Sequence, residues 1–138
     1  MSKVIKAGCI LINTDNKKIA LVYREKQKDF SFPKGHLEEN ETIEECAIRE
    51  TAEETKRDCI LLEKEPIYIE NYITPSGEDV KMYYFISKDI GKSDNKSEDT
   101  HPTFWISFEE VYDKLSYPSL QKVWTSVKDK VKEYLNNY

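Results

Sequence analysis

The chain has 138 residues, of which 38% are hydrophobic and 34% are charged, and its formal net charge is -5. The length suits one domain, and no linker rich in proline or glycine divides residues 1–138, so we expect a single unit. The acidic charge, with no separate Lys/Arg cluster, argues against a scaffold role on DNA. An odd set of cysteines without a CxxC pair (Cys9, Cys46, Cys59) favours reduced thiols in the cytoplasm over a disulfide framework or a zinc site.

The first segments predict a β-hairpin followed by a short third strand. Residues 4–12 and 18–24 are apolar and rich in strand formers, and the stretch between them has the Asn and Asp residues typical of a turn. The apolar run at the N-terminus is too short for a signal peptide or a membrane span, so we expect no membrane association. Residues 30–32 alternate in polarity, and residues 33–36 are expected to form a stiff, exposed loop where the backbone approaches a ligand.

A helix is predicted to begin near residues 40–42 and to run to about Lys56. Thr42 followed by Glu45 offers a capping box at its N-terminus. Every fourth residue places a side chain on one inward face of this helix: Ile43, Ala47 and Thr51.

The second half of the chain predicts more strands and two more helices. The expected strands are residues 59–62, 67–73, 80–86 and 103–107, with a hairpin turn at 75–78 and a polar loop at 91–100. A short helix over 107–115 is expected to be capped by Ser107, and a longer amphipathic helix to begin at Pro118. The apolar stripe of that helix contains Leu120, Val123, Trp124, Val127, Val131 and Leu135.

Hairpins mixed with helices indicate an α+β protein, specifically an α/β/α sandwich with a mixed sheet between helices. The stripe that contains Trp124 fits either the core of this sandwich or a dimer contact, so the oligomeric state, monomer or homodimer, stays open.

The predicted central helix carries three glutamates on one face, because Glu50, Glu53 and Glu54 are spaced i, i+3 and i+4. Each like-charge pair costs about 0.2–0.5 kcal/mol in an isolated helix, and a divalent cation would relieve that cost. A solvated helix face, as in a structural or adaptor protein, is the ordinary alternative. Arg49, the apolar opposite face and the loop around Gly35 favour a built metal site.

Six residues, Gly35, Glu41, Arg49, Glu50, Glu53 and Glu54, have the spacing of the motif GX5EX7REUXEEXGU, so that residues 35–57 resemble the Nudix hydrolase family. Three motif positions depart from the pattern: Thr51, Lys56 and Arg57. Lys56 stands where glycine is usual. A lysine in a left-handed helix-ending position costs about 1 kcal/mol relative to glycine, so we expect the helix to end differently, around Asp58.

The resemblance implies a hydrolase that uses Mg²⁺, with Mn²⁺ as a possible substitute. Its metal ligands would be the carbonyl of Gly35 and the side chains of Glu50, Glu53 and Glu54. The implied catalytic set is Glu50, Glu53 and Arg49, with Glu50 as first choice for the general base, and Glu41 has a structural part in pairing with Arg49. In the predicted loop, Glu98 and Asp99 are alternative bases or metal ligands, or simply solvated acids.

The expected substrate is a small nucleotide in which a diphosphate linkage is cut. Lys34 and His36 flank Gly35 and suit contacts with phosphate, and Tyr72 or Tyr83 suits stacking on a base. Residues 30–36 resemble the diadenosine tetraphosphate hydrolase branch, which favours a dinucleoside polyphosphate. Nucleoside triphosphates, oxidised nucleotides, nucleotide sugars, the 5′ triphosphate end of RNA and a non-catalytic Nudix-fold binding module are the alternatives.

Overall fold

The computed structural model describes residues 3–137. Its elements in chain order are β1 (Val4–Asn13), β2 (Lys18–Arg24), β3 (Asp29–Ser31), β4 (Lys34–His36), α1 (Ile43–Thr55), β5 (Arg57–Leu61), β6 (Tyr68–Ile73), β7 (Asp79–Lys92), β8 (Thr103–Ser107), a 3-10 turn (Phe108–Glu110), α2 (Val111–Lys114) and α3 (Pro118–Asn137). None of the helices in this described part is long and apolar enough to cross a membrane.

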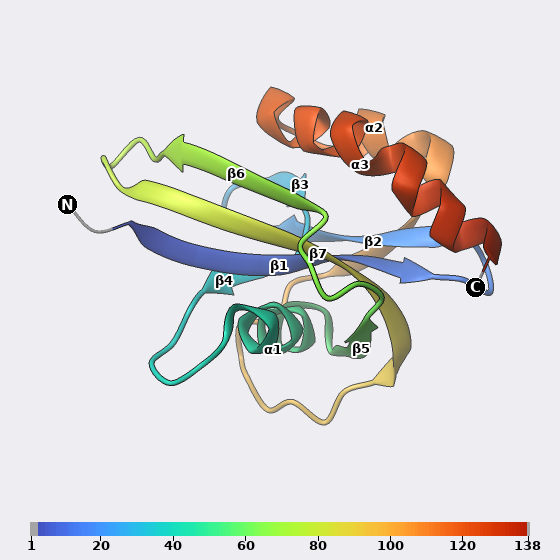
Figure 1. The fold of residues 1–138 in the computed structure, drawn as a ribbon, viewed down its shortest axis with the longest axis horizontal. Coiled ribbons are helices and arrows are strands. Elements are labelled where there is room, and N and C mark those ends of the chain that lie inside the picture. The colour runs from blue at the N-terminus through green and yellow to red at the C-terminus, as the bar shows by residue number, and fades with distance from the viewer. Residues whose placement is uncertain (1–2, 138) are drawn as a thin grey trace.

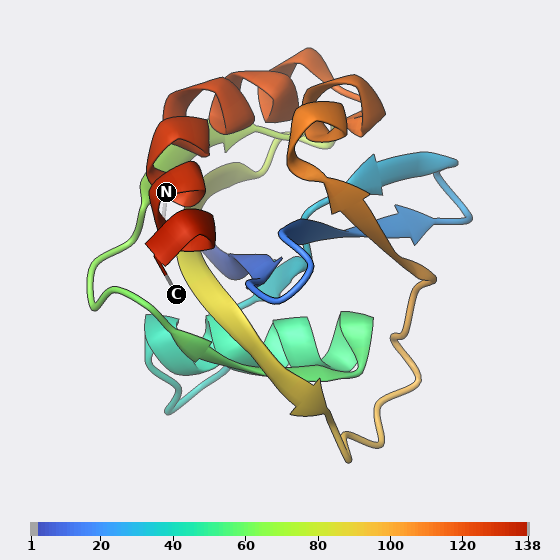
Figure 2. The same cartoon turned by 90° about the vertical axis from the view of Figure 1, so that its right-hand side faces the viewer.

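The strands form one mixed sheet around β1 and β7, which run parallel from the pair Val4 and Val80 to the pair Ile12 and Lys88. The other strand pairs are antiparallel, and β6 and β5 bond to the first and second parts of β7. Helix α1 covers one face of the sheet, and α2 and α3 cover the other (Figures 1 and 2). The predicted α/β/α sandwich with a mixed sheet is therefore confirmed.

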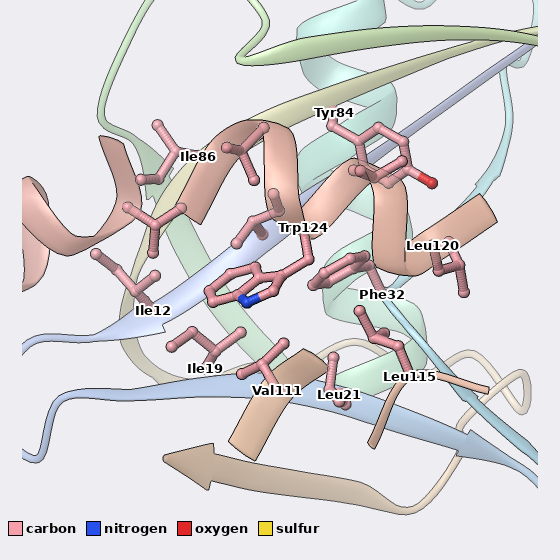
Figure 3. Close-up of a cluster of buried hydrophobic side chains, with 14 of the residues drawn as sticks. Ile12, Ile19, Leu21, Phe32, Tyr84, Ile86, Val111, Leu115, Leu120 and Trp124 are labelled. Carbon is pink, nitrogen blue, oxygen red and sulfur yellow. The ribbon is translucent and has the colours of Figure 1, made fainter. Parts of the chain in front are cut away.

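The two faces of the sheet pack in different ways. On the α3 face, Trp124 is 2% exposed and lies beside Phe32 in the core, with 6.5 Å between the two ring centres (Figure 3). The ring centre of Phe108 lies 5.2 Å from that of Trp124. Trp124 is thus a core residue, which resolves the alternative of a dimer contact. On the α1 face the buried side chains are mostly small, among them Ala7, Ala20, Ala47 and the three free cysteines, and small side chains let the helix approach the sheet closely.

The capping box predicted at the start of α1 is present. The backbone N–H of Glu45 donates to Thr42 Oγ1 (3.1 Å), and that of Thr42 donates to Glu45 Oε1 (2.9 Å). The helix ends at Thr55, close to the predicted end at about Lys56, and the alternative end around Asp58 is wrong, because Lys56 takes the left-handed conformation, with φ 56° and ψ 33°. Its backbone N–H still donates to the carbonyl of Ala52 (3.0 Å), which closes the last turn.

Three further expectations need correction. Residues 34–36 are strand β4 rather than a free loop, because the first half of β1 offers an open edge that pairs Ala7 with Gly35. Strand β7 extends into the predicted polar loop as far as Lys92, because β5 pairs with it there. Residues after Ser107 form a 3-10 turn before the four-residue α2, and the Ser107 side chain makes no capping hydrogen bond.

Candidate functional site

A cavity of about 450 Å³ lies between β4, α1 and the loop that joins β7 to β8, and we call it the acidic cavity. Four of its lining side chains are carboxylates: Glu50, Glu54, Glu98 and Asp99. The remaining lining residues are Lys6, Arg24, Ser31, Lys34, Gly35, His36, Thr100 and His101. The structure therefore brings seven of the predicted site residues together in one cavity.

The acidic cavity depends on a close approach between β4 and α1 at Gly35. A Cβ atom at this position would overlap the carboxyl group of Glu50. The glycine is thus required by space, since its backbone is that of an ordinary strand residue. On the neighbouring residue, the backbone N–H of Lys34 donates to Glu54 Oε1 (3.1 Å), which fixes the second carboxylate.

Arg49 is the centre of a hydrogen-bond network beside the acidic cavity. Its guanidinium binds Glu41 through two hydrogen bonds of 2.5 and 3.0 Å, and also donates to Glu53 (2.7 Å), Glu50 (3.1 Å) and the carbonyl of His36 (2.9 Å). These hydrogen bonds lower the pKa of Glu41 and raise that of Arg49. Arg49 therefore ties the strand, the loop after it and the helix together.

The three helix glutamates do not have equivalent surroundings. Glu50 and Glu54 line the acidic cavity, whereas Glu53 is directed to Arg49 and is not among the lining residues. The i, i+3, i+4 spacing placed all three on one helix face, but only Glu50 and Glu54 line the cavity, and Arg49 Nη1 donates to both Glu50 and Glu53.

Burial sets the electrostatics of the acidic cavity. Loss of solvent raises the pKa of Glu54 to about 7 and raises the pKa of Glu50, and each carboxylate also feels neighbouring negative charge. Burial and the positive charge of Arg24 lower the pKa of Lys34 to about 8. Desolvated carboxylates of this kind bind a proton or a cation more readily than solvated ones.

The chemistry of the donors fits a hard divalent cation, which prefers carboxylate and carbonyl oxygens. Within residues 3–137, no three acidic, histidine or cysteine side chains already converge as ready-made ligands. The guanidinium of Arg49 binds one oxygen each of Glu50 and Glu53. The residues that could hold such a cation are Glu50 and Glu53, through the second oxygen of each, Glu54, and Gly35 through its carbonyl.

A second cavity of about 500 Å³ adjoins the first on the α3 side of the sheet, and we call it the aromatic cavity. Three tyrosines line it, Tyr72, Tyr84 and Tyr117, together with Glu70, Ile73, Pro75, Ser119 and Leu120. Lys6, Arg24 and Lys34 line both cavities, so a row of three cations marks the boundary between them.

One buried carboxylate supports both sides of this boundary. Asp29, 2% exposed, accepts two hydrogen bonds of 2.7 Å from the guanidinium of Arg24 and a third of 2.7 Å from the hydroxyl of Tyr117. Hydrogen bonding from Arg24, with a further contribution from Tyr117, lowers the pKa of Asp29. The ring of Tyr117 and the charge of Arg24 are therefore held by the same group.

The structure does not place Tyr83 with the other predicted substrate contacts. Tyr83 packs on the α1 face of the sheet, with Lys81 Nζ 5.4 Å from its ring centre, and lines neither cavity. Tyr84, the next residue on the same strand, points to the opposite face and lines the aromatic cavity. Tyr72, the other predicted stacking residue, does line it.

Sequence reasoning missed Lys6, Arg24, Tyr84 and Tyr117. His101 also lines the acidic cavity, with its Nε2 3.9 Å from Glu54 Oε2. Arg24 had a local signal, since it ends an otherwise largely apolar strand and Asp29 follows it across a short turn. Tyr117 lies 88 residues along the chain from Asp29, to which its hydroxyl donates, and only tertiary packing brings the two together.

Comparison with known proteins identifies the family. The sequence model of the NUDIX domain matches residues 3–127. The chain therefore belongs to the NUDIX domain family.

Individual relatives agree with this assignment. The chain is 29% identical over 105 residues to a protein of Mycolicibacterium smegmatis named 8-oxo-(d)GTP phosphatase, a match that covers 76% of this chain. It spans about a third of the length of that curated relative, 32%.

Solved structures share the fold. A NUDIX hydrolase from Nitrosomonas europaea superimposes with a TM-score of 0.77 at 20% identity, covering 94% of this chain and 90% of the other. An Ap4A hydrolase from C. elegans, solved as a binary complex, superimposes with a TM-score of 0.69 at 21% identity, covering 96% and 99%.

Proposed function

We propose that this chain hydrolyses a diphosphate linkage in a nucleoside polyphosphate, with Mg²⁺ or, as a substitute, Mn²⁺. The observation that carries the proposal is the row of Lys6, Arg24 and Lys34 shared by the acidic and the aromatic cavities. Three cations between carboxylates on one side and tyrosines on the other match a ligand that has a phosphate chain in its middle and a base at its end.

The residues that would hold the divalent cation are Glu50, Glu53, Glu54 and, through its carbonyl, Gly35. When bound there, the cation supplies charge neutralisation for the phosphate oxygens and lowers the pKa of a bound water. Arg49 and Glu41 keep these donors in place through the hydrogen bonds described above.

The protein's own groups account for the remaining steps. A carboxylate takes a proton from the attacking water while the water oxygen forms a bond to phosphorus. The bond from that phosphorus to the bridging oxygen breaks, and the rest of the substrate leaves with the bridging oxygen. Glu50 is our first choice for this base, because it faces the acidic cavity and burial raises its pKa above the ordinary value of a glutamate. Glu98 and Asp99 face the same cavity and are the alternatives.

Binding and orientation of the substrate fall to the shared cations and the tyrosines. Lys34, Arg24 and Lys6 would contact phosphate oxygens, and His36 lies at the rim of the same cavity. Tyr72 and Tyr117 present rings to the aromatic cavity, where a base can stack.

Among substrates, we place dinucleoside polyphosphates such as diadenosine tetraphosphate first. The supporting points are the resemblance of residues 30–36 to that branch and the fold shared with the C. elegans Ap4A hydrolase. The name of the M. smegmatis relative favours a second candidate, an oxidised nucleoside triphosphate. A cytoplasmic location remains a prediction from the three reduced thiols.

Product analysis with a nucleotide panel tests the proposal. The panel contains diadenosine tetraphosphate, 8-oxo-dGTP, ordinary nucleoside triphosphates, nucleotide sugars and triphosphorylated RNA, each with Mg²⁺ and with EDTA. Mg²⁺-dependent formation of ATP and AMP from diadenosine tetraphosphate supports both the reaction and the substrate class. Cleavage of another member alone retains the reaction and rejects the substrate class, and cleavage of none indicates a binding module.

A further inference from the structure

Lys56, the residue that ends α1, is bonded to the loop between β7 and β8. Its ammonium group donates to the carbonyl oxygens of Asn95 (3.0 Å) and Ser97 (2.5 Å). Its own carbonyl accepts a hydrogen bond from the backbone N–H of Ser93 (2.9 Å). One residue thus holds the beginning and the middle of this loop, which passes beside α1 in Figure 1.

The far end of the loop is bonded to the same helix terminus. The hydroxyl of Thr100 donates to the carbonyl of Glu53 (3.2 Å), and the backbone N–H of His101 donates to that of Glu54 (3.0 Å). These bonds satisfy carbonyl groups that the end of a helix leaves without partners. The loop is therefore fixed at both ends, and Lys56 supplies the attachment in between.

Glu98 and Asp99 lie between the Lys56 attachment and the attachment at residues 100–101. Both are exposed loop residues, and both line the acidic cavity that contains Glu50 and Glu54. The hydroxyl of Ser97, whose carbonyl is bound by Lys56, accepts a hydrogen bond from the backbone N–H of Asp99 (3.1 Å). The position of these acids in the cavity thus follows from the position of Ser97.

We propose that Lys56 is a positioning residue that holds Glu98 and Asp99 at the acidic cavity for the reaction, an inference that rests on the proposed function. Glycine, the usual residue of the motif here, would relieve the left-handed backbone of Lys56 but would have no side chain to bind the loop. The lysine retains an unfavourable backbone conformation and gains two hydrogen bonds to the loop.

Hydrogen exchange on the metal-free protein tests the attachment. The probes are the loop amides that donate hydrogen bonds: Ser93, Asn95, Ser97, Asp99 and His101. In Lys56→Met they should exchange about tenfold faster, because two charged hydrogen bonds are lost. Lys96→Met is the matched control, since Lys96 is exposed on the same loop and its substitution removes the same charge. Unchanged exchange in Lys56→Met would overturn the proposal.

Steady-state kinetics then separate positioning from a purely structural effect. Lys56→Met should lower kcat about tenfold and leave KM within about twofold, and Lys56→Arg should restore most of kcat. Lys56→Gly should lose as much kcat as Lys56→Met without any fall in melting temperature. Faster exchange with unchanged kcat, or an equal loss of kcat in Lys96→Met, would contradict the proposal.

The two proposals fail in different ways. If the wild-type protein cleaves no nucleotide, the proposed function fails, and the exchange comparison alone decides whether Lys56 holds the loop.

Discussion

The acidic and the aromatic cavities share three cations but are assembled from different kinds of sequence. The acidic cavity takes five of its twelve lining residues from one stretch, 34–54, in which helix spacing and a short strand fix their positions. The aromatic cavity combines β6, β7 and the connection between α2 and α3, with Tyr72 and Tyr117 far apart in the chain. This difference suggests that substitutions in the first change turnover, whereas substitutions in the second change substrate binding.

The largest effect is expected from Glu54→Gln, which removes a negative charge from the acidic cavity at nearly constant volume. We expect a fall in kcat on the order of 100- to 1,000-fold, because one of the carboxylates proposed to bind the divalent cation is lost. Steady-state assays at saturating Mg²⁺, with circular dichroism to check the fold, measure it. Glu44→Gln, an exposed acid on the same helix, is the control, and equal activity of the two variants would refute the metal assignment.

Lys34→Ala acts at the boundary between the two cavities. We expect kcat/KM to fall about 30-fold, because one of the three shared cations that face phosphate is removed. The backbone hydrogen bond from residue 34 to Glu54 is retained, so the melting temperature should change little. Lys64→Ala, an exposed lysine distant in sequence, should leave kcat/KM unaltered, and a normal value in Lys34→Ala would exclude the phosphate contact.

Asp29→Asn tests the group that supports both sides of the boundary. Because Arg24 and Tyr117 lower the folded-state pKa of Asp29, its contribution to stability is present above its unfolded-state pKa of about 3.9 and is lost as the pH falls through the folded-state pKa. At pH 7 the variant should lose about 2 kcal/mol of unfolding free energy. Urea denaturation from pH 7 to pH 3 should show this difference shrink below pH 4, and a constant difference would contradict the assignment.

Tyr72→Ala tests whether the aromatic cavity contributes to substrate binding. We expect KM for diadenosine tetraphosphate to rise about tenfold while kcat changes little, because one stacking surface for a base is lost. Tyr72→Phe keeps the ring and should bind normally, and the exposed Tyr112 provides a control in Tyr112→Ala. A fall in kcat with constant KM would place Tyr72 in the chemistry rather than in binding.

The smallest effect is expected beneath the acidic cavity, at Thr51. Its buried hydroxyl makes no hydrogen bond within residues 3–137. The Cys9 thiol is a neighbouring polar group, and a thiol is only a weak hydrogen-bonding group. Thr51→Val should raise the unfolding free energy by about 1 kcal/mol and leave kcat unchanged. Thermal denaturation measures this, and a lower melting temperature would show that the hydroxyl is bonded after all.

The sequence predicted more residues of the acidic cavity than of the aromatic cavity. The capping box of Thr42 and Glu45 fixed the start of α1, and the spacing of Glu50 and Glu54 placed both on the face that lines the cavity. Helix spacing also placed the end of α1 near Lys56, as observed. The later end expected around Asp58 is wrong, because the left-handed conformation of Lys56 is offset by hydrogen bonds to residues about 40 positions later.

In β7, sequence reasoning could not decide which face of the sheet each side chain takes. Tyr83 and Tyr84 are consecutive, and strand geometry sends consecutive side chains to opposite faces. The pairing of Tyr84 with Tyr68 on β6, and of Ala7 with Tyr83, decides which face each tyrosine takes. The strand was predictable, but the residue that reaches the aromatic cavity was not.

By itself, the sequence determined the elements whose signals lie within a few residues: the hairpin, the central helix, its glutamates and the apolar stripe that buries Trp124. The periods of helices and strands are local, so spacing alone fixes which side chains share a face. The tertiary structure decided that β4 pairs with β1 in the sheet, that Glu53 lies against Arg49 outside the lining of the acidic cavity, and that Arg24 and Tyr117 meet at Asp29. Such contacts depend on packing between segments distant in the chain, which no local pattern encodes.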